Sequence, residues 1–429
     1  MYKIESKKAL VSFLTLIFCT SFYLMGPIRI AGDVVPATLL PFSIVLNHNI
    51  YLDKFVEYYK KNDTQTKYFY NYDSHYISSY PITLPLIISP IYIPLKAFYN
   101  FNKMSVEQII ALAYKMGKFV SALITSLSVM FFFILSENLL QNTKKSIFLS
   151  IVYAFATENW AIASNSLWQH GFSELMIILC FISILKLENN IKSKTFSFLL
   201  GLFLALAISE RPTDIVFAVP VFLYILIYKN NYLIYFLLPL ALIGSGLITF
   251  NLMFFKRLTG GYDANFNGNI FKGIIGLLFS PGRGLLIYTP ITIFSFVGLI
   301  LSLKNNKIEN KIYPIASIFI IGQILLIAKW NMWWGGWTYG PRLLTDIVPA
   351  LILLLAPILA IISKNKIILF CFTSLVMISI FIQIMGRFFV GGYAWNSYYS
   401  VDKKPSCLWN IKDSPILWAL EDKKTPALH

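Results

Sequence analysis

Long runs of apolar residues, separated by short polar stretches, recur along most of the chain. An α-helix needs about 20 apolar residues to cross the hydrocarbon core of a bilayer. The strands of a membrane β-barrel would instead give short segments of alternating polarity. The pattern predicts eleven transmembrane helices, within residues 8–27, 108–136, 146–163, 172–187, 196–209, 213–228, 233–252, 285–303, 312–328, 343–362 and 366–385.

The composition agrees with this pattern. Of the 429 residues, 57% are hydrophobic and 13% are charged, and the mean hydropathy is +0.66. A soluble domain cannot bury so much apolar surface, so we expect an all-α polytopic membrane protein. The first run follows Lys3, Lys7 and Lys8 as in a signal peptide. Its length and the lack of a small-residue cleavage site favour a retained anchor.

The net charge of +16 is better explained by membrane topology than by nucleic-acid binding. The lysines cluster in short loops between runs, and such loops face the cytoplasm. We therefore expect a plasma membrane protein, in a bacterial inner membrane or in another plasma membrane, with a cytoplasmic N-terminus and an outer C-terminus. The loop lysines are Lys144, Lys145, Lys186, Lys192, Lys194, Lys229, Lys304, Lys307, Lys311, Lys364 and Lys366.

This topology depends on how the stretch Pro81–Leu95 is placed. It is apolar but carries four prolines, which disfavour a regular helix and suit a broken segment at the membrane surface. If it crossed the membrane, every later loop would invert and the lysine-bearing loops would face outward. The division that we expect is 1–27 (N-terminus and first helix), 28–107 (outer loop with juxtamembrane helices), 108–385 (helices two to eleven) and 386–429 (outer tail).

All six arginines fall on the outer side in this topology, although the inner loops use only lysine. The planar guanidinium binds phosphate or carboxylate through two hydrogen bonds, which the lysine ammonium cannot do. The arginines therefore either bind an anionic group of a substrate or serve as interfacial anchors and local ion-pair partners. They are Arg29, Arg211, Arg257, Arg283, Arg342 and Arg387.

One carboxylate, Asp33, stands just beyond the first apolar run. A charge where a helix leaves the membrane is costly unless it has a task. On the outer side, Asp33 is placed to act as a base toward a lipid-carried substrate. The neighbouring residue is Val34, so any second acid must come from elsewhere. Glu158, at the outer end of the third helix, is the first candidate for that role or else a partner for an arginine.

The densest local signal is the aromatic and glycine-rich segment Trp330–Arg342. Glycines let a backbone approach a ligand closely, and aromatic faces can stack on sugar rings. An aromatic belt at the membrane edge is the alternative. Arg342 and Asp346 are four residues apart and can form an ion pair on a helix face. The candidate substrate-pocket residues are Glu158, His170, Trp333, Trp334, Trp337, Tyr339 and Asp346.

Two shorter motifs carry further arginines. Arg283 lies between glycines in Ser280–Gly284, a turn that can form an anion nest. Arg211 follows Glu210, with which it can pair. The four cysteines have no pair spacing, so neither a disulfide framework nor a metal site is predicted.

Taken in order, these features resemble the GT-C superfamily of integral-membrane glycosyltransferases. The resemblance is to bacterial members akin to protein O-mannosyltransferases and the lipid A aminoarabinose transferase, and it covers about residues 8–400. The matching pieces are Gly32-Asp33, the proline-rich stretch Tyr80–Leu95, Glu210-Arg211-Pro212-Thr213, Ser280-Pro281-Gly282-Arg283-Gly284, Trp333-Trp334-Gly335-Gly336-Trp337 and Gly340-Pro341-Arg342.

The resemblance implies a GT-C-like fold with an outward-facing site. That site would move a sugar from a polyprenyl-phosphate donor to a glycan, lipid or protein acceptor of the cell envelope, with Asp33 as catalytic base. Arg342, Arg283 and Arg211 would bind the donor phosphate. Several family members have a paired Asp-Glu where this chain has Asp33-Val34. That difference leaves the acceptor and any divalent metal undecided, and no other cofactor is expected.

Two other classes of function remain open. A lipid or sugar transporter would need ionisable groups near the middle of the membrane and related halves. The sequence has no evident internal repeat, and its ionisable groups gather at one side. A non-catalytic envelope-assembly subunit would tolerate the loss of Asp33.

Overall fold

The computed structural model describes residues 2–62, 66–261, 265–304, 311–362 and 364–423. Lys307 and residues 424–429 of the predicted outer tail lie outside the described residues. The side chains of Lys3, Lys7 and Lys304 do so as well.

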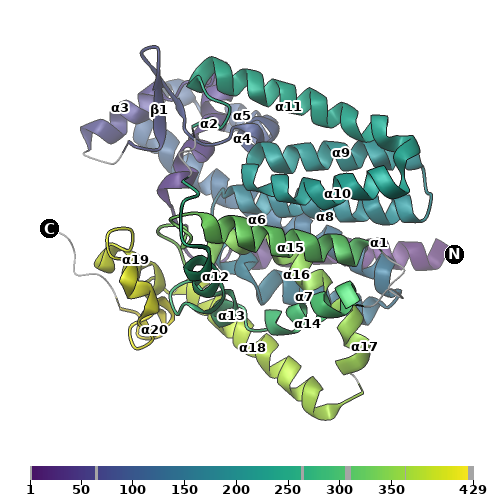
Figure 1. The fold of residues 1–429 in the computed structure, drawn as a ribbon. Coiled ribbons are helices and arrows are strands. Elements are labelled where there is room, and N and C mark those ends of the chain that lie inside the picture. The colour runs from purple at the N-terminus through teal and green to yellow at the C-terminus, as the bar shows by residue number, and fades with distance from the viewer. Residues whose placement is uncertain (1, 63–65, 262–264, 305–310, 363, 424–429) are drawn as a thin grey trace.

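Six helices are long and apolar enough to cross a membrane, and they indicate a helical membrane protein. Most of them run roughly side by side, with α11 at the upper edge of the molecule in this view, and α18 crosses at an angle (Figure 1). The six are α6 (Val106–Leu140), α8 (Gln169–Glu188), α9 (Ser193–Glu210), α11 (Leu233–Phe255), α15 (Ile312–Lys329) and α18 (Lys366–Phe388).

Further apolar helices complete the bundle. α8 packs against α9, α9 against α11, and α1 against α6. The outer face of α11 exposes Ile234, Leu238 and Leu242, as a face toward lipid requires. These further helices are α1 (Tyr2–Leu24), α7 (Thr143–Phe155), α10 (Ile215–Tyr228), α14 (Thr292–Lys304), α16 (Val348–Leu353) and α17 (Leu359–Ile362).

Two of the apolar runs are broken helices. The run 285–303 divides into α13 (Leu285–Tyr288) and α14, with Pro290 between them. The run 343–362 begins as a 3₁₀ segment, η7 (Arg342–Ile347), and η8 (Ala356–Ile358) separates α16 from α17. Proline lacks the N–H that a continuous helix would use, and Pro349 and Pro357 lie within this run.

The segment 28–107 forms short helices and one small sheet. The helices are α2 (Val35–Asn47), α3 (Asp53–Lys61), α4 (Thr83–Ile88) and α5 (Leu95–Phe98). With η2 (Ser89–Tyr92), α4 and α5 divide the proline-rich stretch into short turns. In α4, the backbone N–H of Leu84 donates to Glu210 Oε2 over 2.8 Å, which ties this segment to the end of α9.

The sheet was not expected from the sequence. Strands β1 (Phe69–Tyr72) and β2 (His75–Ser78) pair antiparallel, with Phe69 opposite Ser78. Asp73 and Ser74 turn the chain with positive φ values of 44° and 69°, as a tight hairpin requires. Apart from this hairpin, the regular structure of the described residues is helical.

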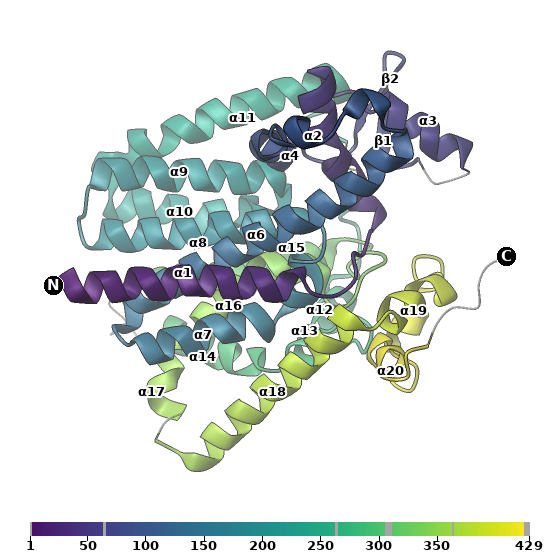
Figure 2. The same cartoon turned by 180° about the vertical axis from the view of Figure 1, so that it is seen from behind.

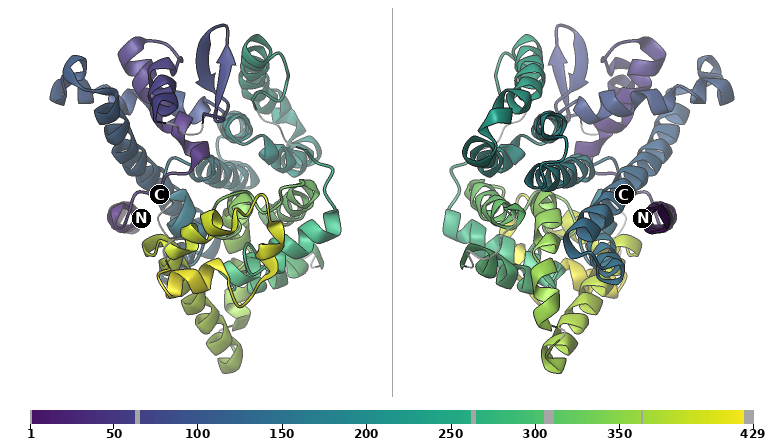
Figure 3. Two further views of the ribbon diagram at one scale, coloured as in Figure 1. Left: turned by 90° about the vertical axis from the view of Figure 1, so that its left-hand side faces the viewer. Right: turned by 90° about the vertical axis from the view of Figure 1, so that its right-hand side faces the viewer.

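The C-terminal segment returns to the same end of the bundle as residues 28–107. It contains α19 (Gly391–Tyr399), η9 (Pro405–Trp409) and α20 (Pro415–Leu420). The N-terminus lies at the opposite end (Figure 2). Seen end-on, residues 28–107 lie over one side of the bundle end and the C-terminal segment over the other (Figure 3).

The two ends of the bundle differ in their charged side chains. At the end that holds the N-terminus, Lys8 lies 3.3 Å from Glu137, and Lys229 donates to Asn190 over 2.8 Å. At the opposite end, Arg29 donates to the carbonyl of Phe389 over 2.8 Å. Arg387 donates to the carbonyl of Pro27 over 3.0 Å, so the ends of α1 and α18 are joined by arginines.

Candidate functional site

Asp33 and Arg342 face one another where the first helix, the outer segment and the aromatic segment meet. Arg342 Nη1 donates to Asp33 Oδ2 over 2.6 Å, across 309 positions of sequence. Arg342 Nη2 donates to the carbonyl of Gly335 over 2.6 Å, and the guanidinium lies 4.4 Å from the ring centre of Trp168. The Arg342 side chain is therefore held from three sides, while that of Asp33 remains 32% exposed.

The local sequence fixes the position of Asp33. Ala31 is extended, and Gly32–Val34 form the 3₁₀ turn η1 that leads directly into α2. The ring of Tyr68 lies over Gly32, where a β-carbon would be 1.8 Å from the Tyr68 ring. Asp33 thus precedes the N-terminus of a 13-residue helix, where a negative charge is favoured by the helix dipole.

The surroundings of Asp33 keep it ionised. Burial by itself would raise the pKa of Asp33, but the Arg342 guanidinium and hydrogen bonds from Arg342 and Tyr80 lower the pKa below its ordinary value. For Tyr68, burial and then the charge of Asp33 raise the pKa. An ionised carboxylate beside neutral tyrosine hydroxyls is suited to accept a proton from a substrate hydroxyl.

Consecutive glycines explain how the aromatic segment holds two arginines. Gly335 and Gly336 have φ values of 72° and 71°, in the left-handed region that favours glycine. Their carbonyls accept hydrogen bonds from Arg342 and from Arg283, the latter over 3.0 Å. Arg283 is fully buried and also donates to the carbonyl of Trp334 and to Asn396 Oδ1. Arg283 therefore holds the segment in place.

Asp33 and Arg342 line a cavity of about 920 Å³ at this end of the bundle. Its volume is within the range of small-molecule sites. Its wall includes two carboxylates, four cationic side chains and a majority of aromatic and small residues. The polar and aromatic members are Asp33, Asp402, Arg29, Lys67, Lys403, Arg342, Asn165, Asn396, Ser166, Ser400, Tyr59, Tyr68, Tyr80, Tyr114, Tyr393, Trp168, Trp330 and Trp337.

One side of this cavity carries excess positive charge. The Arg29 guanidinium lies 4.4 Å from the ring centre of Tyr393. Burial lowers the pKa of Arg29, and the nearby Tyr393 and Asp422 oppose that shift. Arg387 donates to Asn165 Oδ1 over 2.7 Å just behind the wall. This side is suited to an anionic group.

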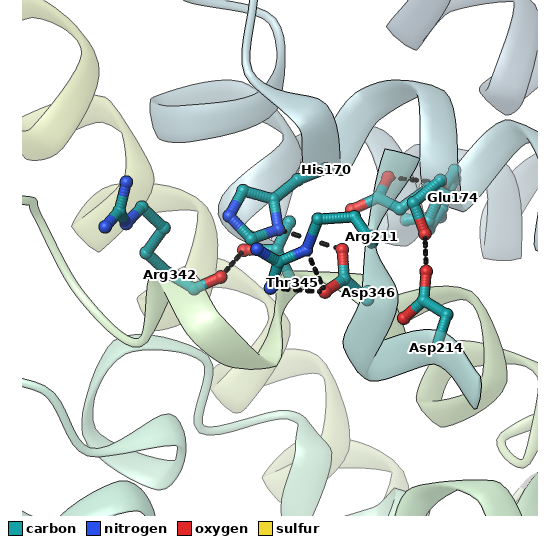
Figure 4. Close-up of polar contacts among 9 residues, drawn as sticks. His170, Glu174, Arg211, Asp214, Arg342, Thr345 and Asp346 are labelled. Atoms are coloured by element: carbon teal, nitrogen blue, oxygen red, sulfur yellow. Dashed lines mark hydrogen bonds and ion pairs between the residues drawn. The ribbon is translucent and has the colours of Figure 1, made fainter. Parts of the chain in front are cut away.

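A buried ion-pair cluster lies behind Arg342. Asp346 stands between His170 and Arg211, as Figure 4 shows. His170 Nδ1 is 2.8 Å from Asp346 Oδ1, and Arg211 approaches Asp346 Oδ2 with Nε at 3.1 Å and Nη2 at 3.0 Å. The cluster joins the start of α8, the end of α9 and η7, and it fixes the turn that carries Arg342.

The sequence suggested an ion pair between Arg342 and Asp346, and the structure gives each of them other partners. Arg342–Ile347 is a 3₁₀ segment, in which residues three apart, and not four, eclipse one another. Thr345 Oγ1 donates to the carbonyl of Arg342 over 2.7 Å within this turn. Arg211 likewise pairs with Asp346, while its neighbour Glu210 accepts from Leu84.

Apart from Trp337, the remaining predicted pocket residues are buried and do not belong to the described cavity wall. Glu158 accepts from Thr289 over 2.6 Å. Tyr339 donates to the carbonyl of Ile382 over 3.0 Å, and Trp334 Nε1 donates to Asp402 over 2.9 Å. Within the described part of the chain, the cavity wall includes Asp33, Arg342 and Trp337 of the predicted set. It does not include Arg283, Arg211, Glu158, His170, Trp333, Trp334, Tyr339 or Asp346.

Sequence reasoning missed several members of this wall. Arg29 belonged to the arginine set but had no motif around it. Asp402 and Lys403 come from the C-terminal tail, and Tyr68 and Tyr80 come from the outer segment. Tyr80 begins the proline-rich stretch, and that is the one local signal that could have found it.

Two ionisable side chains inside the bundle were also not anticipated. Lys118 of α6 is buried and donates to the carbonyl of Ser164 over 2.9 Å. Glu174 of α8 is buried and accepts from the hydroxyl of Tyr153 over 2.6 Å. Among the described residues, no group of three or more His, Cys, Asp or Glu side chains is arranged to hold a metal ion.

Comparison with protein families and with curated proteins adds no relative: no family model matches the chain, and no curated protein is significantly similar to it.

Proposed function

We propose that this protein is a GT-C-type glycosyltransferase with eleven transmembrane passes and a cytoplasmic N-terminus. It moves a sugar from a polyprenyl-phosphate donor to a glycan, lipid or protein acceptor at the outer face of a bacterial plasma membrane. The observation that carries the proposal is the cavity at the end of the bundle opposite the N-terminus. There a paired Asp33 and Arg342 line the same cavity as Arg29 and several aromatic side chains.

The arrangement suits an inverting transfer. The donor phosphate binds on the cationic side, between Arg29 and Arg342. Arg342 then pairs with the phosphate as well as with Asp33, and its ion pair with Asp33 becomes weaker. The acceptor hydroxyl attacks the anomeric carbon as the bond from that carbon to the phosphate oxygen breaks. Asp33 accepts the hydroxyl proton, and the lipid phosphate leaves with the bonding electron pair, stabilised by the two guanidiniums.

The aromatic wall gives this reaction a place for the sugar. Trp168 and Trp337 are distant in the sequence but line the same cavity as Asp33. Trp337 is 49% exposed, so its ring surface is available to a ligand. The C–H faces of a sugar ring carry small positive charges that suit the negative face of an indole.

A direct test uses the purified protein in lipid nanodiscs. The donors are a panel of short-chain polyprenyl-phosphate hexoses, and a cell-envelope extract supplies the acceptors. We expect release of polyprenyl phosphate, measured by mass spectrometry, that requires both the protein and Asp33. Sugar uptake into sealed proteoliposomes without any release of polyprenyl phosphate would favour a transporter instead.

Replacing Arg342 with glutamine is expected to lower transfer about 10²–10³-fold, as the loss of one charge-stabilising group does in other enzymes. It should also shift the pH dependence. Arg342 lowers the pKa of Asp33, so its removal raises that pKa. A base works only while deprotonated, and the acid limb of kcat/KM against pH should therefore move to higher pH.

The matched control for this variant is Arg257→Gln. Arg257 also lies at this end of the bundle, but it donates to the carbonyl of Gly260 and is absent from the described wall of the cavity. This control should keep both the rate and the pH profile. An Arg342→Gln enzyme whose acid limb stays in place would contradict the pairing with Asp33.

A further inference from the structure

A second, smaller cavity lies on the other side of the aromatic segment. Its volume is about 220 Å³, below the range of drug-sized sites and suited to one small ring. Trp330 lines both cavities, and Trp334 of the small cavity donates to Asp402 of the large one. The small cavity is lined by Gly268, Asn269, Lys272, Trp330, Asn331, Trp333, Trp334, Pro405 and Trp409.

Three parts of the chain build this cavity. The backbone N–H of Gly268 donates to the carbonyl of Lys329, and that of Asn331 donates to the carbonyl of Asn265, over 2.9 and 3.0 Å. These two bonds hold the loop before α12 (Ile270–Phe279) against the aromatic segment. Trp409 of η9 completes the wall from the C-terminal tail.

The tryptophans are held at fixed angles. Trp333 and Trp334 meet edge to face at 5.9 Å between ring centres, and Trp333 lies 6.2 Å from Trp409. The ring of Trp333 packs on Gly276 of α12, where a β-carbon would be 2.4 Å from it. Trp333 and Trp334 are themselves buried, so the ring surface open to a ligand is that of Trp409, which is 38% exposed, and of the half-buried Trp330. Because Trp333 positions Trp409, little side-chain entropy is lost when a ligand binds there.

The polar groups at this cavity are mostly neutral. The side chain of Asn269 accepts from the backbone N–H of Lys272 and so caps α12. Asn331 is exposed. Lys272 is the one charged side chain in the described wall. Amide groups at the edge of aromatic faces suit a ligand that has apolar C–H faces and a rim of hydroxyls, as a sugar ring has.

We propose that this small cavity binds one neutral pyranose ring of the acceptor, next to the site of transfer. The acceptor would then be a glycan, and the ring bound here would orient it toward Asp33. Its place in the reaction rests on the proposed glycosyl transfer, while sugar binding at this cavity does not. A lipid phosphate is less suited to it because a single exposed lysine supplies the positive charge.

Binding can be measured without any transfer. The probes are neutral disaccharides of glucose, galactose, mannose and N-acetylglucosamine, added to the Asp33→Asn protein in nanodiscs. We expect at least one disaccharide to change the tryptophan fluorescence in a saturable way. Trp409→Ala should weaken its affinity about tenfold through the loss of one stacking face, and Trp409→Phe should restore part of it.

Asn410→Ala is the matched control, because Asn410 is an exposed neighbour of Trp409 that is absent from the described wall. It should bind as the parent does. Absence of saturable binding, or equal affinity in Trp409→Ala, would overturn the proposal. Binding of glycerol phosphate that is lost in Lys272→Ala, with no disaccharide response, would assign the cavity to a lipid headgroup. Because Asp33 is already replaced, failure of the proposed transfer reaction would leave this result unaffected.

Discussion

Replacing Asp33 with asparagine will lower the rate of sugar transfer about 10²–10⁴-fold, the range that a positioned general base contributes. The amide keeps the size of the side chain but cannot accept the proton of the acceptor hydroxyl. Asp33 lies at the wall of the cavity with its carboxylate partly exposed, so the fold should tolerate the change. The measurement is the initial rate of polyprenyl-phosphate release at saturating donor.

Two further variants make this result specific. Asp33→Glu keeps a carboxylate that is displaced by one methylene, and it should retain more activity than Asp33→Asn. Glu57→Gln removes an exposed carboxylate on α3 in the same outer segment and should leave the rate unchanged. Transfer by Asp33→Asn at near the parent rate, with the protein folded, would rule out Asp33 as the base.

Replacing Asp346 with asparagine is expected to cost about 3–5 kcal/mol of stability, as the loss of one partner of a buried ion pair does. Asp346 is fully buried and carries the negative charge against which Arg211 and His170 are packed. Without it, the buried guanidinium of Arg211 loses this countercharge. The measurement is the free energy of unfolding by SDS in mixed micelles, compared with that of the parent protein.

The matched control is Asp53→Asn. Asp53 also pairs with a histidine, His75, at 2.7 Å, but 48% of the His75 side chain is exposed. An exposed pair contributes about 0–1 kcal/mol. If both variants lost the same small amount of stability, the cluster at Asp346 would not be a structural support of the site.

The apolar pattern predicted a helical membrane protein because crossing a membrane is a local requirement on each segment. Of the eleven predicted spans, six coincide with helices that are long and apolar enough to cross a membrane among the described residues. Helices α6, α8 and α15 lie where the sequence placed them, within a few residues. The hairpin at Phe69–Ser78 was missed because its strands are short and rich in tyrosine, a pattern that also suits a polar loop. The 3₁₀ segment at Arg342–Ile347 was missed because it leads directly into an apolar run, and composition does not distinguish a 3₁₀ turn from the first turn of an α-helix.

The arginines illustrate what the sequence could not resolve. A glycine on each side of Arg283 suggested an anion site. In the structure, however, the Arg283 guanidinium donates hydrogen bonds to backbone carbonyls of the same protein. Arg29 has no motif around it, but it lines the cavity. Whether an arginine faces a cavity or the protein interior depends on residues that are distant in the sequence. The sequence around the arginine does not predict those contacts.

By itself the sequence determined that the chain is a helical membrane protein. Of the eleven site residues that it predicted, Asp33, Arg342 and Trp337 line the described wall of the cavity and the other eight do not. The class of protein and the prediction for Asp33 follow from the hydrophobic effect and from the cost of charge at a membrane edge, which act on each segment separately. Only the tertiary structure decided that Asp33 pairs with Arg342 and that Arg29 and Asp402 complete the cavity. These contacts join positions that are hundreds of residues apart, and packing of the whole bundle brings them within reach.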